Sequence, residues 1–196
     1  PRAAGAALDA CTPDYCTTPP LALAAFRTPD PQVGELLLSN GATPNPPTDL
    51  GMTPLHFAAV AKNVDATRLL LEANARPNTQ DRGDGSTPLH YAMRTVSDES
   101  PRVLGEELRL LTRAGANPNA RNYRKETPLL VFMERSNLTD ETVISECLSA
   151  LNAFVEAGAE PDAVDASGRS PIFKVFENPG RRLPEWKIRL MVELGC

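Results

Sequence analysis

Apolar residues recur at helical spacing in the second half of the chain. Leu104, Leu108 and Leu111 lie three or four positions apart, as residues on one helix face do. A longer set begins behind Thr139 and spans roughly 18 residues, or about 27 Å as a helix. This set consists of Ile144, Cys147, Leu148, Leu151 and Val155. The pattern predicts two long amphipathic helices in this half of the chain.

The shorter apolar runs follow a repeated motif. GMTPLHFAA at 51–59 returns as GSTPLHYAM at 85–93, and weaker copies are TTPPLALAA at 17–25, KETPLLVFM at 125–133 and GRSPIFKVF at 168–176. A turn marker recurs between these runs, as GAALDA at 5–10, GATPNP at 41–46, NARPNT at 74–79, GANPNA at 115–120 and GAEPDA at 158–163. Two motif series in one phase indicate a stack of repeats.

The residues at the start of each motif are suited to begin a helix. Thr53 and Thr87 are good N-cap residues, because a hydroxyl there can accept from free backbone N–H groups. Proline follows at the first helical position, where its missing N–H costs nothing. These prolines are Pro54, Pro88, Pro128 and Pro171, with Pro20 in the first copy. The motif therefore predicts a short helix in every repeat.

The turn marker is suited to end a helix. Gly41, Gly115 and Gly158 follow apolar runs, where a helix end favours left-handed backbone angles, and Asn74 takes the same place in the second repeat. The spacing from marker to motif proline stays at 13 or 14 residues, whereas the spacing from proline to the next marker varies between 20 and 30. Repeats three to five are thus lengthened between their two helices. Helix starts are expected at Pro101, behind Thr139 and at Pro184.

Together the two motifs resemble those of the ankyrin repeat family. The T-P-L-H-x-A motif is matched fully at 53–58 and at 87–92. The resemblance implies an all-α repeat fold, an ankyrin-type α-solenoid of stacked helix-turn-helix repeats joined by β-hairpin-like loops. We expect one domain over 5–196. Its repeats cover approximately 11–43, 44–76, 77–117, 118–160 and 161–196, and residues 1–10 form the end of a preceding repeat or an N-terminal cap.

The resemblance also assigns the two histidines. His56 and His90 stand in T-P-L-H, where the family uses histidine for hydrogen bonds that tie hairpins and neighbouring repeats together. Ala22, Leu130 and Phe173 occupy this position in the other repeats. The outer repeats are therefore expected to be looser or more apolar in this layer.

Composition and charge exclude several function classes. Only 5% of the residues are aromatic and 19 are proline, which disfavours a large α/β enzyme sheet. With 20 basic and 25 acidic residues there is no general basic field for nucleic acid. No apolar run is long enough to span a membrane. Four Cys are too few for a disulfide scaffold, which indicates reduced thiols and an intracellular location, in cytoplasm or nucleus.

No residue pattern in the chain supports catalysis. Both histidines have structural roles, the cysteines have no base near them, and no glycine loop with a following Lys could hold phosphate. Asp81, Asp84 and the acidic residues at 162–165 are expected in turns for conformational reasons rather than as a calcium site. We expect no enzyme activity, no cofactor, no metal and no small-molecule substrate.

A binding surface is implied by the resemblance. Proteins of the family bind partners with their hairpin tips and the exposed face of their inner helices, which form a concave groove. Applied here, the groove is apolar at one end and charged in the middle. Its partner-binding candidates are Phe26, Leu50, Met52, Val60, Asp84, Arg94, Tyr123, Arg124, Glu134, Arg135 and Arg169, and Ser86 and Glu126 are expected to point into it as well.

The third hairpin stands out within this surface. RNYRKE replaces the usual small turn, and Lys125 stands where Gly51, Gly85 and Gly168 stand in the other repeats. Tyr and Arg dominate interface energetics, so Tyr123 and Arg124 are candidate contacts, with an ordinary solvated turn as the alternative. The arginines favour a protein or peptide partner with an acidic segment.

Several functions remain open at this point. The first is a non-catalytic protein-protein interaction module that serves as scaffold, adaptor or substrate receptor. The second is a targeting or regulatory segment of a larger enzyme or channel. Nucleic-acid binding through the third hairpin and the stretch 181–189 is disfavoured, because no series of stacking aromatics accompanies the basic residues.

The two ends of the chain and its long outer helices lead to further expectations. The turn marker already stands at Gly5-Ala6 and returns at Gly195-Cys196, so we expect either that the protein is part of a longer chain or that its terminal helices are unusually polar. We also expect a monomer. The extended outer helices either pack against one another or offer a second binding edge.

Overall fold

The computed structural model describes residues 8–9, 18–27, 30–95, 101–135, 141–176 and 185–194. Within these ranges the chain forms ten α-helices and no β-strand. The inner helices are α2 (Pro20–Arg27), α4 (Pro54–Ala61), α6 (Pro88–Arg94), α8 (Pro128–Arg135) and α10 (Pro171–Phe176). The outer helices are α3 (Gln32–Ser39), α5 (Val64–Glu72), α7 (Pro101–Arg113), α9 (Glu141–Glu156) and α11 (Glu185–Glu193).

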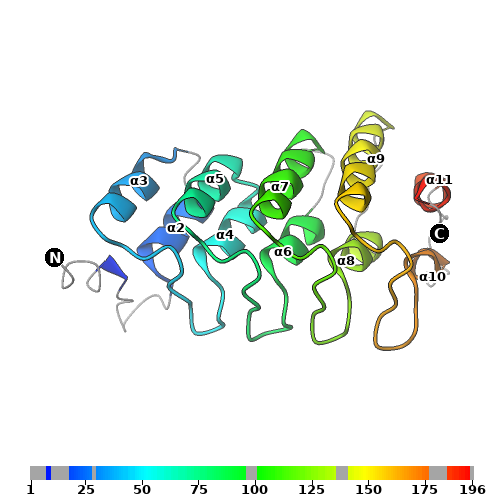
Figure 1. Ribbon diagram of the computed structural model, residues 1–196, viewed down its shortest axis with the longest axis horizontal. Coiled ribbons are helices and arrows are strands. Elements are labelled where there is room, and N and C mark those ends of the chain that lie inside the picture. The colour runs from blue at the N-terminus through cyan, green and yellow to red at the C-terminus, as the bar shows by residue number, and fades with distance from the viewer. Residues whose placement is uncertain are drawn as a thin grey trace.

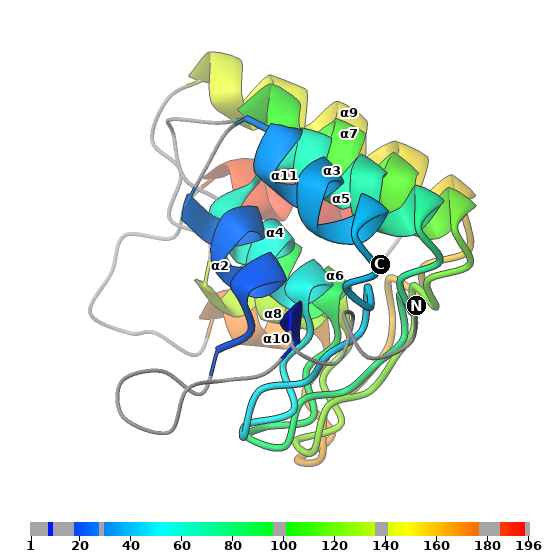
Figure 2. The ribbon, with the colours of Figure 1, turned by 90° about the vertical axis from the view of Figure 1, so that its left-hand side faces the viewer.

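The helices form two layers along an elongated stack. In Figure 1 the outer helices lie in an upper row, the inner helices in a row below them, and loops hang beneath both rows. The end-on view in Figure 2 shows the loops projecting together to one side of the helices. Each inner helix packs on the next inner helix, and α5, α7 and α9 pack in succession. This is the all-α repeat solenoid that the sequence predicts.

The predicted helix boundaries are found at the motif residues. Pro54 and Pro88 are the first residues of their helices, and Thr53 and Thr87 form capping boxes with the histidines three positions later. Gly41, Gly115, Gly158 and Asn74 all adopt positive φ, at 93°, 86°, 100° and 65°. The outer helices are therefore terminated by the left-handed residues that the turn marker supplies.

The motif leucines form the centre of the core. The residue after the motif proline is almost completely buried in four repeats, as Leu21, Leu55, Leu89 and Leu129. Burying a leucine side chain stabilises the folded state by about 1.5–3 kcal/mol, so this row holds successive inner helices together. The core therefore consists of many small contacts between adjacent repeats rather than of one large aromatic centre.

The loops below the helices end in four described hairpin tips, which we number by residue range. They are the first tip (48–52), the second (81–86), the third (122–126) and the fourth (165–169). In each tip the first residue donates its backbone N–H to the carbonyl of the last residue, at 2.8–3.1 Å. A side-chain oxygen of that first residue accepts one or two further N–H groups of the turn, as Asp81, Asn122 and Asp165 do. The acidic residues at 81 and 165 thus have the predicted turn role.

Backbone hydrogen bonds link successive tips. Arg82 N–H donates to the Leu50 carbonyl at 2.7 Å, Tyr123 N–H to the Asp84 carbonyl at 2.8 Å, and Ala166 N–H to the Arg124 carbonyl at 2.9 Å. Each pair joins two repeats. The tips are therefore held as one continuous edge, with fixed spacing between their side chains.

A second set of bonds joins the repeats at the turn markers. The Asn78 side chain donates to the Gly115 carbonyl and accepts from Asn117 N–H, at 2.8 and 2.7 Å. Asn45 and Asn119 make equivalent bonds to the following repeat. The Asn of the marker thus spans two repeats, a role that the sequence analysis did not assign.

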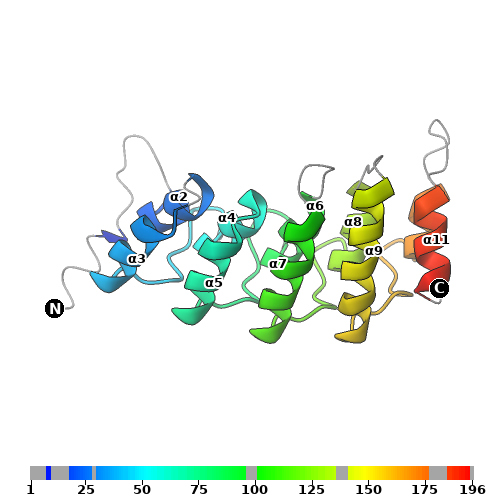
Figure 3. The ribbon, with the colours of Figure 1, turned by 90° about the horizontal axis from the view of Figure 1, so that it is seen from above.

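The outer helices lengthen toward the C-terminal half. α7 has 13 residues and α9 has 16, against 8 in α3 and 9 in α5, and Figure 3 shows their greater length from above. α7 begins at Pro101, as predicted. The predicted starts behind Thr139 and at Pro184 lie outside the described residues, and the described parts begin at Glu141 and Glu185. Ile144, Cys147, Leu148 and Leu151 are buried on one face of α9.

Candidate functional site

The histidine layer ties two of the tips to the inner helices of the preceding repeats. The ring nitrogen Nδ1 of His56 accepts Thr53 N–H at 2.9 Å, so Nε2 carries the proton and donates to the Ser86 carbonyl at 3.2 Å. His90 repeats this arrangement with Thr87 N–H and the Glu126 carbonyl. Burial lowers the pKa of both imidazoles, which keeps them neutral. Their role is structural, as the resemblance implies.

Between the fourth and fifth repeats an ion cluster takes the place of this layer. Lys174 Nζ lies 2.6 Å from Glu126 Oε1, 2.7 Å from Glu134 Oε2 and 3.5 Å from Asp165 Oδ2. Arg124 and Arg169 complete the cluster through Glu126 and Asp165. The expectation of a looser or more apolar layer is wrong at this interface. Lys174, one position after Phe173, pairs with buried carboxylates. Leu130 stands at the histidine position of the fourth repeat and has no polar group that could bond to them.

The cluster shifts the pKa values of its members. Burial alone would raise the pKa of Glu126, but hydrogen bonds from Lys174 and Asn122 lower it to about 2. Burial likewise opposes ionisation of Asp165, whose pKa the bonds from Arg169 lower to about 2. The pKa of Lys174 is raised despite its burial, because its ammonium group donates hydrogen bonds to the Glu126 and Glu134 carboxylates. All these groups are charged at neutral pH.

A polar and aromatic cluster lies where the first and second tips meet α6. The Tyr91 hydroxyl donates to Asp81 Oδ2 at 3.1 Å and lies 3.9 Å from Met52 Sδ. The Arg94 guanidinium lies over the Tyr91 ring, 4.9 Å from its centre, and pairs with Asp84 at 2.6 Å. Burial and the Asp81 charge raise the pKa of Tyr91 to about 12, so its hydroxyl stays protonated. Tyr91 was missed by the sequence analysis, although it directly follows the motif histidine.

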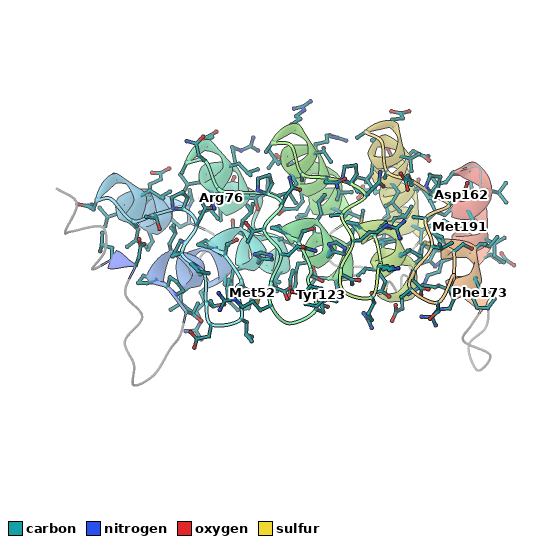
Figure 4. The ribbon with its side chains drawn as sticks, turned by 60° about the horizontal axis from the view of Figure 1, so that its bottom comes forward. Met52, Arg76, Tyr123, Asp162, Phe173 and Met191 are labelled. Carbon is teal, nitrogen blue, oxygen red and sulfur yellow. The ribbon has the colours of Figure 1, made fainter. Side chains whose placement is uncertain are left out.

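Tyr123 is both exposed and firmly held. Its side chain is 65% exposed, yet its ring lies against Gly85, where an added Cβ would be only 2.5 Å from Cδ1. Its hydroxyl donates to the Asp81 carbonyl at 3.3 Å. Figure 4 shows Tyr123 beside Met52 along the tip edge, with Arg76 set back from that edge toward the outer helices. A large aromatic face is thus presented to solvent in one orientation.

The predicted groove arginines are mostly neutralised within the chain. Arg94 pairs with Asp84, Arg124 with Glu126 and Arg169 with Asp165. The described part of α8 includes Arg135, but its side chain lies outside what the structure describes. The structure therefore brings most of the predicted charged residues together as internal pairs.

Two residues expected in the groove are buried instead. Ser86 is completely buried, and its carbonyl accepts the His56 proton. Glu126 is 1% exposed, inside the ion cluster. Both have partners in a neighbouring repeat, His56 for the Ser86 carbonyl and Lys174 for the Glu126 carboxylate. The prediction that these two side chains face the groove is wrong.

The apolar end of the predicted surface adjoins an open hollow. This hollow of about 510 Å³ lies between the ends of α2 and α4 and the starts of α5 and α7. Phe26, Ala61, Val64 and Val103 supply its apolar lining. Phe26 is half-exposed and meets Phe57 edge to face, and Leu50 is 62% exposed at the first tip. Val60 and Met52 are partly buried.

Two further observations bear on chemistry. Among the described residues, no three His, Cys, Asp or Glu side chains gather in a way that could hold a metal ion. In the same part of the chain, no helix combines the length and the hydrophobicity that crossing a membrane requires. Cys147 is buried in α9, and Cys11, Cys16 and Cys196 lie outside the described residues.

Comparison with known proteins identifies the architecture. A sequence model described as ankyrin repeats (3 copies) matches residues 21–107. The chain is 36% identical over 131 residues to the B-cell lymphoma 3 protein homolog of Mus musculus. The aligned region covers 66% of this chain and 26% of that protein.

Two other relatives match shorter shares of their own length. Neurogenic locus notch homolog protein 4 of Homo sapiens is 38% identical over 61% of this chain and 6% of that protein. Palmitoyltransferase ZDHHC17 of Danio rerio is 40% identical over 44% of this chain and 13% of that protein. The chain thus spans about a quarter or less of these relatives. With its motifs, its capping boxes and its stacked helix pairs, the chain belongs to the ankyrin repeat family.

Proposed function

We propose that this chain is a non-catalytic interaction module that binds an intracellular protein or peptide along its tips and inner helices. The single observation that carries the proposal is Tyr123, a large aromatic side chain that is 65% exposed while its ring lies against Gly85 and its hydroxyl donates to the Asp81 carbonyl. Rigid exposed aromatics bind partners with little loss of side-chain entropy. Met52, Leu50 and Phe26 extend the apolar contact area toward the first repeat. Scaffold, adaptor and substrate-receptor roles all fit this surface.

A larger protein with an activity elsewhere is the second candidate. It is favoured by the matched palmitoyltransferase, of which the aligned part is only 13%. In that case the module would target or regulate a catalytic segment outside these residues. Both candidate functions use the same binding surface. For both we expect the module to be monomeric.

Affinity purification with matched variants tests the proposal. The tagged chain is compared with a Met52→Ala, Tyr123→Ala double variant and with Arg76→Glu, which changes an exposed residue set back from the tip edge. We expect one set of proteins to be recovered by the wild type and by Arg76→Glu, and lost with the double variant. Recovery of the same proteins by all three chains, at equal melting temperature, would contradict the proposed surface.

A further inference from the structure

The basic side chains of the tips fall into two groups with different partners. Arg94, Arg124 and Arg169 each pair with a carboxylate of this chain. The ion cluster around Lys174 contains three cations and three carboxylates, so it carries no net charge. These arginines therefore offer little attraction to an outside anion.

Three other cations at the tips have no carboxylate partner among the described residues. The Arg82 guanidinium donates to the Asp49 carbonyl, and the Arg121 guanidinium donates to the carbonyls of Lys125 and Val164. Lys125 is exposed. Carbonyl bonds position a guanidinium without cancelling its charge. We call Arg82, Arg121 and Lys125 the cationic strip.

The backbone of the third tip is strained at a member of this strip. Lys125 has a φ of 57°, whereas the residues at the same place in the other tips are glycines, with φ of 73–75°. A non-glycine residue in this region costs free energy, and exposed Lys125 gains no packing in return. Strain without a structural benefit is typical of binding sites.

The strip adjoins exposed apolar side chains on the same edge. Tyr123 lies two residues before Lys125, and the N–H of Arg82 is bonded to the carbonyl of Leu50, which is 62% exposed. Asp49 is the exposed carboxylate at this edge, beside Leu50 on the first tip. Cations thus prevail at the second and third tips, while the first tip is apolar and weakly acidic.

We infer that the tip edge binds an extended acidic segment of a partner protein. Apolar side chains of that segment contact Leu50 and Tyr123, and its carboxylates pair with the cationic strip. This inference rests on the proposed function and deepens it. It moves the acidic contact from the groove arginines, which are neutralised, to the tips. Removing the charge of Asp49 should strengthen the interaction.

A synthetic peptide tests this assignment directly. The probe is a ten-residue peptide with two leucines flanked by glutamates, and its control carries glutamine in place of glutamate. Titration into the ¹⁵N-labelled chain should shift the amide signals of Leu50, Arg82, Tyr123 and Lys125. The glutamine peptide should bind at least about tenfold more weakly at low salt.

Variants separate the strip from the rest of the surface. Arg82→Glu with Lys125→Glu should weaken binding about tenfold, Asp49→Asn should strengthen it, and Arg76→Glu should leave it unchanged. Lys125→Gly is the sharpest variant, because it should raise the melting temperature while it weakens binding about threefold. If Lys125 had only a structural role, its replacement by glycine would not raise the melting temperature and weaken binding at the same time.

Three results would overturn the inference. They are equal binding of the glutamine peptide, amide shifts centred on Arg94 and Arg169, and absence of binding to either peptide. If natural partners are still lost with Met52→Ala and Tyr123→Ala, the proposed function stands and only the acidic tip assignment fails.

Discussion

At the scale of single residues, the hairpin tips show which features follow from local sequence. The helix-ending glycines, the N-cap threonines and the turn-forming Asp residues act within a few positions of their own place in the chain, so motif and spacing predict them. The seat of Tyr123 on Gly85 joins residues of two repeats, 38 positions apart in the sequence. Only the stacked structure brings them into contact. The same reason hid the burial of Ser86 and Glu126, whose partners belong to neighbouring repeats.

The seat of Tyr123 gives a prediction with a built-in control. Gly85 and Gly168 have almost the same φ, 73° and 74°, but an added Cβ at Gly168 meets nothing within 4 Å. Gly168→Ala should therefore lower the free energy of unfolding by about 1 kcal/mol through strain alone. Gly85→Ala should cost at least about 1 kcal/mol more, because the methyl group displaces the Tyr123 ring. Chemical denaturation measures both.

A second variant checks the cause of that difference. In the Tyr123→Ala background the two glycine substitutions should cost the same, since the ring is gone. An excess cost at Gly85 that persists without the ring would place the obstruction elsewhere.

At the scale of elements, the outer helices were predicted in length and face but not in their polar contacts. The apolar periodicity of α9 is sufficient to place its buried face. Glu107 of α7 is different, because its charged neighbours in the sequence suggest a solvent-exposed side chain. It is 1% exposed, accepts from the Thr67 hydroxyl of α5 at 2.7 Å, and its Oε2 has no partner within the described residues. Its burial follows from the packing of α7 on α5.

Glu107 predicts a pH dependence of stability. Burial raises its pKa from 4.5 to about 7, against the weaker opposing effect of the Thr67 bond. A carboxyl whose folded pKa is raised contributes stability that is complete below pH 4.5 and is lost as the pH rises through 7. Glu107→Gln mimics the protonated form. It should match the wild type at pH 4 and exceed its unfolding free energy by about 3 kcal/mol at pH 8.

Exposed Arg109 on the same helix is the control, because it is not among the groups that shift the pKa of Glu107. Arg109→Gln should leave the pH dependence of the wild type unchanged. The prediction is contradicted if the unfolding free energies of wild type and Glu107→Gln change in parallel between pH 5 and 8. Glu107 would then be ionised in the folded state at little cost in free energy.

The last outer helix gives the third prediction. Trp186 of α11 is buried and meets Phe132 of α8 edge to face, with ring centres 6.1 Å apart. Its indole N–H has no hydrogen-bond partner among the described residues, so its contribution is packing. Trp186→Ala should lower the unfolding free energy by about 3 kcal/mol, and Trp186→Phe by much less. Lost partner binding at unchanged stability would instead make α11 a second binding edge.

At the scale of the whole molecule, stability is distributed over interfaces between neighbouring repeats. Three sets of bonds cross these interfaces, at the marker asparagines, at the tips and at the histidine layer or its ionic replacement. The family resemblance was enough to predict the architecture and the histidine layer. It could not predict the ion cluster, because Lys174, Glu126 and Asp165 are unremarkable residues until three segments of the chain meet.

Cutting the central interface should therefore divide the molecule. His90→Leu removes the bond to the Glu126 carbonyl and leaves Thr87 N–H without its acceptor, at an expected cost of about 2 kcal/mol. Because each repeat contacts only its neighbours, urea unfolding should broaden or separate into two steps. Arg113→Gln on the exposed side of α7 should leave one cooperative transition. A single unshifted transition in His90→Leu would contradict the role of this layer.

The central claim is that the tip edge is where this module meets its partner, and site-specific photo-crosslinking tests it most directly. A benzophenone amino acid is placed at Leu50, which is exposed on the first tip, or at exposed Arg76, which is set back from the tips toward the outer helices. In the cells that express the protein, irradiation should link a discrete partner to the Leu50 chain and not to the Arg76 chain. Equal crosslinking from both positions, or a partner captured only from Arg76, would contradict the account.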